Sequence, residues 1–200
     1  MPPFNADDAS PIFLGYRAKK PWVPEGDWDP DHLTGVVEVC SVSDCLARPP
    51  PDWIERWDFN RACCYATVEA AWETVPDDDR ADYRVFALWL VSATTDESGE
   101  WVYPRPDDWF PADQPELPRG VGPTDLPRLG FGVVSLHRKI MGWGHSPLSC
   151  NLMAREGPVN RYCLIDTLEE AAGLIERWNH GGEGVEPETY CAVLVYATEP

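Results

Sequence analysis

Four residues of metal-binding type occupy matching points of two similar segments. "CSVSDC" runs from Cys40 to Cys45, and "HSPLSC" runs from His145 to Cys150. Three thiolates and one imidazole form an ordinary tetrahedral ligand set for zinc, and the gap within each pair is at the wide end of the usual spacing. If the two segments face each other, these four side chains are candidate zinc ligands. The other interpretation is that the cysteines are buried and behave as small hydrophobic residues.

A cysteine nucleophile is a second chemistry for the same residues, with His137 or His145 as its general base. His145 precedes Ser146 and lies five residues before Cys150. The surrounding sequence has no nucleophile elbow, no glycine-rich phosphate loop and no histidine motif paired with a carboxylate. Serine, asparagine and cysteine also recur in both segments, whereas a catalytic site that forms once per chain need not appear twice. The pattern therefore favours structural roles over catalysis.

The charge balance favours partners of opposite sign. The chain of 200 residues has 34 acidic residues against 16 Lys and Arg, a formal net charge of −18. This charge repels nucleic acid and anionic membranes, so neither is expected as a partner. We expect a basic protein partner, for example a toxin or nuclease that an immunity or inhibitor protein covers. The alternative is that the acidity only keeps the protein soluble.

An acidic, tryptophan-bearing stretch is the predicted contact surface for such a partner. It includes "DDWFPADQPELPRG" from Asp107, and the predicted partner-binding residues are Trp101, Asp107, Asp108 and Trp109. Tryptophan is the residue type that most often anchors an interface, and charge steers the encounter. The expected function is a non-enzymatic protein-binding module without a cofactor. A zinc site or a thiol-dependent site is the alternative.

A repeat within the chain indicates how these residues are positioned. "NRACCYATVEAA" begins at Asn60 and "NRYCLIDTLEEA" at Asn160, and six of the twelve positions are identical. The paired asparagines are expected to hold turns by bonding nearby backbone. Thr67 and Thr167 are each expected to begin a helix.

Further matches extend the repeat at other offsets. "LGYR" from Leu14 matches "LGFG" from Leu129, and a run led by Tyr83 matches one led by Tyr190. Loops tolerate such changes of length, whereas helices and strands do not. We therefore predict a tandem duplication of an α+β unit, which forms one pseudo-symmetric domain or two small packed domains. The predicted divisions are a flexible N-terminus (1–10), a first repeat (11–95), a proline-rich acidic connector (96–125) and a second repeat (126–200).

Each repeat is expected to read strand, loop, strand, helix, strand. In the second, the predicted strands are 131–137, 161–165 and 189–198, and a helix follows the capping-box spacing of Thr167 and Glu170. In the first, the matching helix is expected to stop at Pro76. The connector is expected to lack regular structure, and 48–57 to form a short helix. The sheet should be mostly antiparallel or mixed.

The location of the protein is predicted from what the sequence lacks. No apolar run approaches bilayer length, and "MPPFNADDAS" at the N-terminus has neither a basic flank nor an apolar stretch. We therefore expect a cytoplasmic protein. In a reducing compartment the seven cysteines are expected to be free thiols or metal ligands rather than disulfides.

Overall fold

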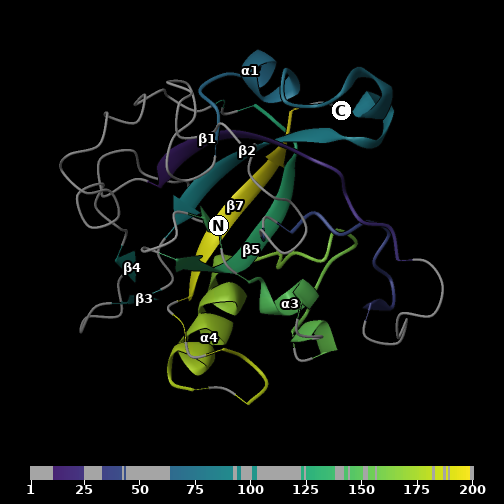
Figure 1. Cartoon of the computed structure of the whole chain (residues 1–200). Helices are drawn as coiled ribbons and strands as arrows, with labels where there is room; N and C mark the ends of the chain where they lie inside the picture. Colours follow the sequence, from purple (N-terminus) through teal and green to yellow (C-terminus); the bar gives the residue numbers. More distant parts are fainter. Residues whose placement is uncertain are drawn as a thin grey trace.

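The computed structural model describes the parts of the chain that make up the sheet and its helices. The described residues are 11–24, 33–41, 43, 64–91, 94–95, 101–102, 123, 125–137, 142–143, 145–150, 153–155, 157–181, 183–186, 188 and 190–198. Only the backbone is described at 94–95, 101–102, 136–137, 142–143 and 150. Figure 1 shows an antiparallel sheet flanked by short helices, so the fold is of the mixed α+β class, as predicted.

The main sheet has five strands in the order β1-β2-β7-β5-β6, and every neighbouring pair is antiparallel. The strands are β1 (Ile12–Lys19), β2 (Arg84–Val91), β7 (Tyr190–Ala197), β5 (Arg128–His137) and β6 (Gly142–Trp143). A separate hairpin pairs β3 (Thr94–Thr95) with β4 (Trp101–Val102). Strands from both predicted repeats therefore share one sheet, with β2 and β7 side by side at its centre.

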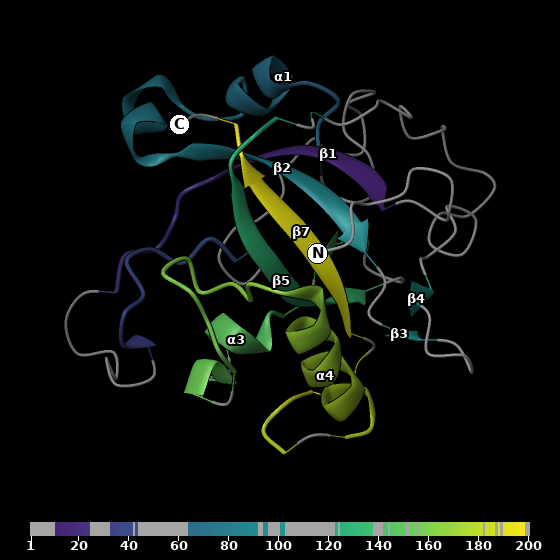
Figure 2. The ribbon, with the colours of Figure 1, turned by 180° about the vertical axis from the view of Figure 1, so that it is seen from behind.

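The helices lie at opposite ends of this sheet. They are α1 (Val68–Trp72), the 3-10 helix η2 (Asp77–Asp82), α3 (Pro147–Cys150), the 3-10 helix η3 (Met153–Arg155) and α4 (Leu168–Asn179). Figures 1 and 2 both place α1 and η2 near the end of β7, and α4 and α3 near its start. The two ends of the sheet are therefore covered by different sets of helices.

Two threonines begin the two α-helices that the repeat predicts. The Thr67 hydroxyl accepts a hydrogen bond from the Ala70 amide at 3.1 Å, and the Thr167 hydroxyl accepts one from the Glu170 amide at 3.2 Å. Each bond satisfies an amide that has no partner within the helix. The Thr167 hydroxyl also donates to the Glu170 carboxylate at 2.7 Å. The predicted helix starts are confirmed, although α1 ends at Trp72, before Pro76.

The outer strand pairs have matching registers. Gly15 pairs with Leu88 in β1 and β2, and Gly130 pairs with Val195 in β5 and β7, each directly after a register shift. Leu88 and Val195 in turn pair with each other across the centre of the sheet. The residue after each glycine forms an isolated bridge to the segment before a helix: Tyr16 to Tyr65, and Phe131 to Ile165.

Both register shifts require glycine for two reasons. Gly15 has φ of +117° and Gly130 has φ of +144°, which side-chain-bearing residues rarely adopt. A Cβ atom at Gly15 would lie 2.4 Å from the Tyr65 carbonyl oxygen, and one at Gly130 would lie 2.9 Å from the Ile165 carbonyl oxygen. The bridging segments approach the strands too closely for any other residue.

The core lies on both faces of the sheet, as alternation along β7 shows. Ala192 and Leu194 belong to the hydrophobic cluster that contains the buried face of α4. Cys191, Val193 and Val195 belong to a second cluster that includes Leu14 and Ala71. Because successive strand side chains point to opposite faces, β7 is buried on both sides.

Two secondary-structure predictions were wrong. Residues 161–165 do not form a strand but a turn, with a single bridge from Ile165 to each of Val159 and Phe131. The amides of Tyr162 and Leu164 bond the Asn160 side chain instead of a neighbouring strand. Connector residues 101–102 form β4, so that segment contains regular structure. The predicted helix at 48–57 lies outside the described residues.

Candidate functional site

The predicted zinc ligands are only partly described, so the zinc prediction stays a prediction. Cys40 is buried, and its amide donates to the Tyr162 carbonyl at 3.0 Å. His145 is half-buried, and its amide donates to the Ser135 hydroxyl at 3.0 Å. Cys45 and the side chain of Cys150 lie outside the described part. Among the described side chains, no three Cys, His, Asp or Glu residues are grouped so that they could hold a metal ion.

Cys40 has an environment unsuited to a thiol nucleophile. Burial, together with the nearby Glu38 carboxylate, raises the pKa of its thiol to about 12, although Lys19 acts in the opposite direction. The thiolate is the nucleophilic form, so Cys40 is protonated at neutral pH. Burial also raises the pKa of Cys191. The side chain of His137, the other candidate base, is outside the described set.

The Asn160 side chain organises the turn that precedes α4. Its amide nitrogen donates to the Leu129 carbonyl at 2.7 Å and to the Asp166 carboxylate at 2.8 Å. Its oxygen accepts from the amides of Tyr162 at 2.9 Å and Leu164 at 3.3 Å. The structural role predicted for this residue is confirmed. Its counterpart, Asn60, lies outside the described residues.

A buried cysteine sits within this turn. Cys163 has φ of +56°, the only positive value among the described residues other than glycine. Its thiol is fully buried and faces the Leu148 carbonyl oxygen at 3.8 Å. The segment that contains Cys40 packs on the same turn, because the Val37 and Glu38 amides both donate to the Arg161 carbonyl. These contacts connect the turn to its neighbours and expose no reactive group.

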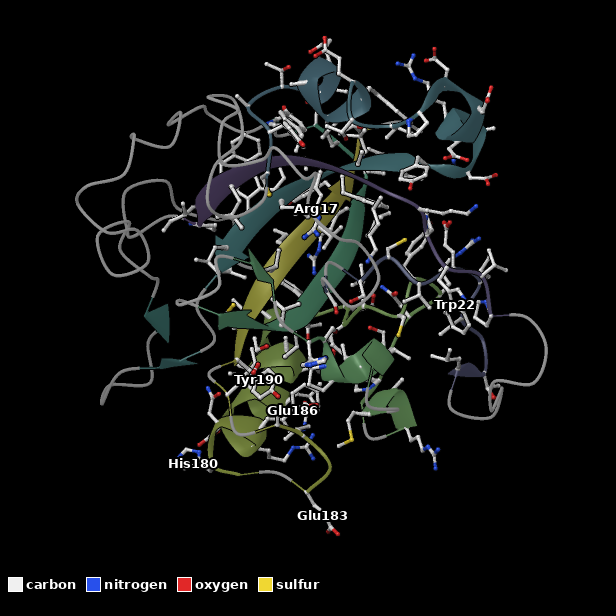
Figure 3. All side chains as sticks on the ribbon, in the orientation of Figure 1. Arg17, Trp22, His180, Glu183, Glu186 and Tyr190 are labelled. Atoms are coloured by element: carbon white, nitrogen blue, oxygen red, sulfur yellow. The ribbon has the colours of Figure 1, made fainter. Side chains whose placement is uncertain are left out.

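The ionisable residues that are described in the loop after α4 do not converge on one site. Figure 3 shows Tyr190 beside Glu186, whereas His180 and Glu183 point away from them. The Tyr190 hydroxyl donates to the Glu186 carbonyl oxygen at 3.0 Å, and burial is the main cause that raises the pKa of Tyr190. His180 is the C-cap of α4, and its ring nitrogen lies 2.7 Å from the Glu176 carbonyl oxygen. These bonds fix the end of the helix.

The predicted partner-binding residues fall where the structure gives little or no description. Trp101 is described only as backbone, in β4. Asp107, Asp108 and Trp109 lie outside the described residues. Their predicted role in binding is therefore still a prediction.

The acidic surface that the structure does describe is formed by α1 and η2. Its exposed acidic residues are Glu69, Glu73, Asp77, Asp78, Asp79 and Asp82. Residues 67–84 also contain Arg80 and Arg84, so six acidic and two basic residues give this segment a net charge of −4. Two exposed ion pairs, Lys20 with Asp82 and Arg80 with Asp77, offset part of this charge. We call this surface the α1–η2 face.

An open groove of about 630 Å³ lies within the α1–η2 face. Glu69 and Trp72 of α1 and its C-cap Glu73 line one side, and Arg80 and Ala81 line it from η2. The spacing of i, i+3 and i+4 places Glu69, Trp72 and Glu73 on one side of the helix. This groove was not predicted from the sequence, because it joins residues on either side of Pro76. The run "DDDR" from Asp77 was the available signal.

Comparison with protein-family models, curated proteins and solved structures found no match to this chain. No helix in the described part of the chain is both long and apolar enough to cross a bilayer.

Proposed function

We propose that this protein is a non-enzymatic module that binds a basic surface of a partner protein. The observation that carries the proposal is the α1–η2 face, where five exposed acidic residues lie on two short helices and a sixth, Glu73, is the C-cap of α1. An immunity or inhibitor protein that covers a basic toxin or nuclease in the cytoplasm fits this description. The net charge of −18 adds long-range attraction to such a partner.

The α1–η2 face holds its charges on regular structure. α1 begins with the Thr67 cap, and η2 is connected to β2 through Tyr83, whose amide donates to the Arg80 carbonyl. Charges that are already positioned need little ordering when a partner binds, which lowers the cost of association. The acidic residues whose charge no basic neighbour offsets then act mainly on the rate at which the protein and its partner associate.

The duplication of the α+β unit is part of the same proposal. The matching registers around Gly15 and Gly130, and the two threonine caps, support it. The central pairing of Leu88 with Val195 is what a twofold axis through the sheet would produce. On this view, the residues that both halves share maintain the fold. A feature that is present in only one half is then a candidate for a functional role.

Association kinetics test the proposed function. The full chain is immobilised, the protein that it captures from its native lysate is identified, and the association rate with that purified protein is measured. Exposed charges more than one Debye length apart are screened, and this length falls from about 10 Å at 0.1 M salt to about 3 Å at 1 M. We expect the association rate to fall at least about tenfold over this range.

Charge reversal locates the surface that is responsible. Reversing Asp77, Asp78 and Asp79 to Lys should slow association more than it speeds release. Reversal of Asp107 and Asp108 tests the connector in the same way. The control matched in charge to the triple reversal reverses Glu169 and Glu176 of α4 and Glu183 of the following loop, all of which are exposed. An association rate that does not respond to salt would refute the proposal and leave the acidity as a solubility feature.

A further inference from the structure

The groove in the α1–η2 face combines two kinds of side chain that a cation prefers. Glu69 and Glu73 supply exposed carboxylates, and Trp72 supplies a half-buried indole between them along the helix. A cation over an indole ring is attracted by the negative face of the ring, and tryptophan is the strongest such partner among aromatic residues. The groove is open to solvent, so a side chain that projects from a partner surface can reach it.

One positive charge also lines the groove and has to be accounted for. The Arg80 guanidinium forms an ion pair with the Asp77 carboxylate at 3.2 Å, and both side chains are largely exposed. This ion pair offsets the positive charge of Arg80 on the η2 side of the groove. The α1 side of the groove therefore has an excess of negative charge.

The groove belongs to one half of the chain only. At the offset of 100 residues that relates Thr67 to Thr167, Trp72 and Glu73 correspond to Ala172 and Gly173. Ala172 is a buried residue of α4, and Gly173 is an exposed one. The second half therefore has neither the indole nor the second carboxylate, and α4 continues where α1 ends.

We propose that this groove receives a lysine or arginine side chain of the basic partner. The ammonium or guanidinium group lies over Trp72, and Glu69 and Glu73 bind its charge. The inference rests on the proposed function, because the partner supplies the cation. It adds a defined contact to a surface that would otherwise attract the partner only through its overall charge.

An NMR titration with small probes tests the groove directly. The probe is Nα-acetyl-lysine methylamide, and the control probe is Nα-acetyl-norleucine methylamide, which has the aliphatic chain without the ammonium group. The indole N–H signal of Trp72 is assigned by its absence in Trp72→Phe. We expect a saturable shift of this signal and of the backbone amide signals of Glu69 and Glu73 with the lysine probe at low salt, and none with the norleucine probe. The amide signals report binding in the variants that lack the indole.

Substitutions separate the groove from the general acidity of the protein. Glu69→Gln with Glu73→Gln should weaken binding of the lysine probe about two- to fivefold, and Trp72→Leu should weaken it by a similar factor because the cation–π contact is lost. Asp78→Asn with Asp79→Asn removes the same charge outside the groove and should change binding less than twofold. Equal weakening by this control pair, or an equal shift with the norleucine probe, would overturn the inference.

Two further measurements keep the outcomes distinct. Trp72 packs partly against the core, so circular dichroism must show that each variant folds, and Trp72→Phe, which keeps an aromatic ring, should retain more affinity than Trp72→Leu. If the lysine probe does not bind although capture of the partner remains salt-sensitive, the groove is rejected and the proposed function stands. If the probe binds but partner association ignores salt, the proposed function fails and the groove stands.

Discussion

Replacing Asn160 with Ala should destabilise the fold more than any other single change in the turn before α4. The substitution removes four hydrogen bonds, two that the side-chain amide donates and two that its oxygen accepts. A hydrogen bond contributes about 0.5–1.5 kcal/mol net. The residue is half-buried, so we take the lower part of the summed range and expect a loss of about 2–4 kcal/mol.

Urea denaturation followed by circular dichroism measures this loss. For a chain of this size the same loss lowers Tm by about 4–16 °C. The graded control is Asp166→Ala, which removes only one of the four bonds and should cost much less. A loss below about 1 kcal/mol for Asn160→Ala would show that water replaces these bonds and that the turn does not depend on the side chain.

Asn160→Asp adds a test with a defined sign. The variant keeps the oxygen that accepts from the Tyr162 and Leu164 amides, but it turns a second carboxylate towards Asp166, where the amide nitrogen now lies 2.8 Å from a carboxylate oxygen. At neutral pH the two like charges repel, and this repulsion raises the pKa at which the pair takes up one proton, so it is removed in the acidic range above the ordinary carboxyl pKa of about 4. The deficit in stability relative to the natural chain should therefore be largest at neutral pH and shrink as the pH falls through this range.

Three further predictions concern the bulge glycines, Cys40 and zinc. Gly15→Ala and Gly130→Ala should each lower the free energy of unfolding, measured in urea, by at least about 2 kcal/mol. At Gly173 an added Cβ meets no atom within 4 Å, so Gly173→Ala should stabilise α4 by about 0.5–1 kcal/mol. Equal effects at all three positions would contradict the argument from close approach. Cys40, with its pKa raised to about 12, should resist iodoacetamide at pH 7.5 until urea unfolds the protein, and peptide mass mapping measures this labelling; rapid labelling of the folded chain would refute the prediction. The free energy of unfolding should also decline as the pH rises from about 9 to 12, because the thiol of the unfolded chain loses its proton first. Metal analysis of protein purified without chelator should find no stoichiometric zinc, and Cys45→Ser should cause only a modest loss of stability; one zinc per chain, lost together with folding in the variant, would establish the zinc alternative.

Local sequence signals predicted the elements whose determinants lie within one turn or one strand. Thr167 and Glu170 are three residues apart and meet in the cap of α4. The apolar run from Tyr190 forms β7, which is buried on both faces as such runs are. These features need no knowledge of distant contacts, so a single sequence contains enough information.

The turn at 161–165 shows where such signals fail. Its residues have a strand-like composition, but Asn160 takes up two of its amides and Cys163 adopts φ of +56°. The same asparagine also reaches the Leu129 carbonyl, which is 31 residues away along the chain. This arrangement depends on β5 being in place beside the turn. Composition cannot report such a contact, and the strand prediction was therefore wrong.

The groove was missed for a related reason, and the comparison of the two halves explains why it matters. Residue types that the halves share, such as the threonine caps and the bulge glycines, have structural roles at both positions. Trp72 has no aromatic counterpart, because Ala172 occupies the matching point. In the second half the helix continues to Asn179, whereas in the first it ends at Trp72 and an acidic 3-10 helix follows. If the halves descend from one unit, the fold explains why the threonine caps and the glycines are shared. It does not explain why the last turns of the helix in the second half are replaced by an acidic 3-10 helix in the first. We propose that binding of the basic partner accounts for the difference, and the α1–η2 face is the surface on which charge reversal should have its largest effect.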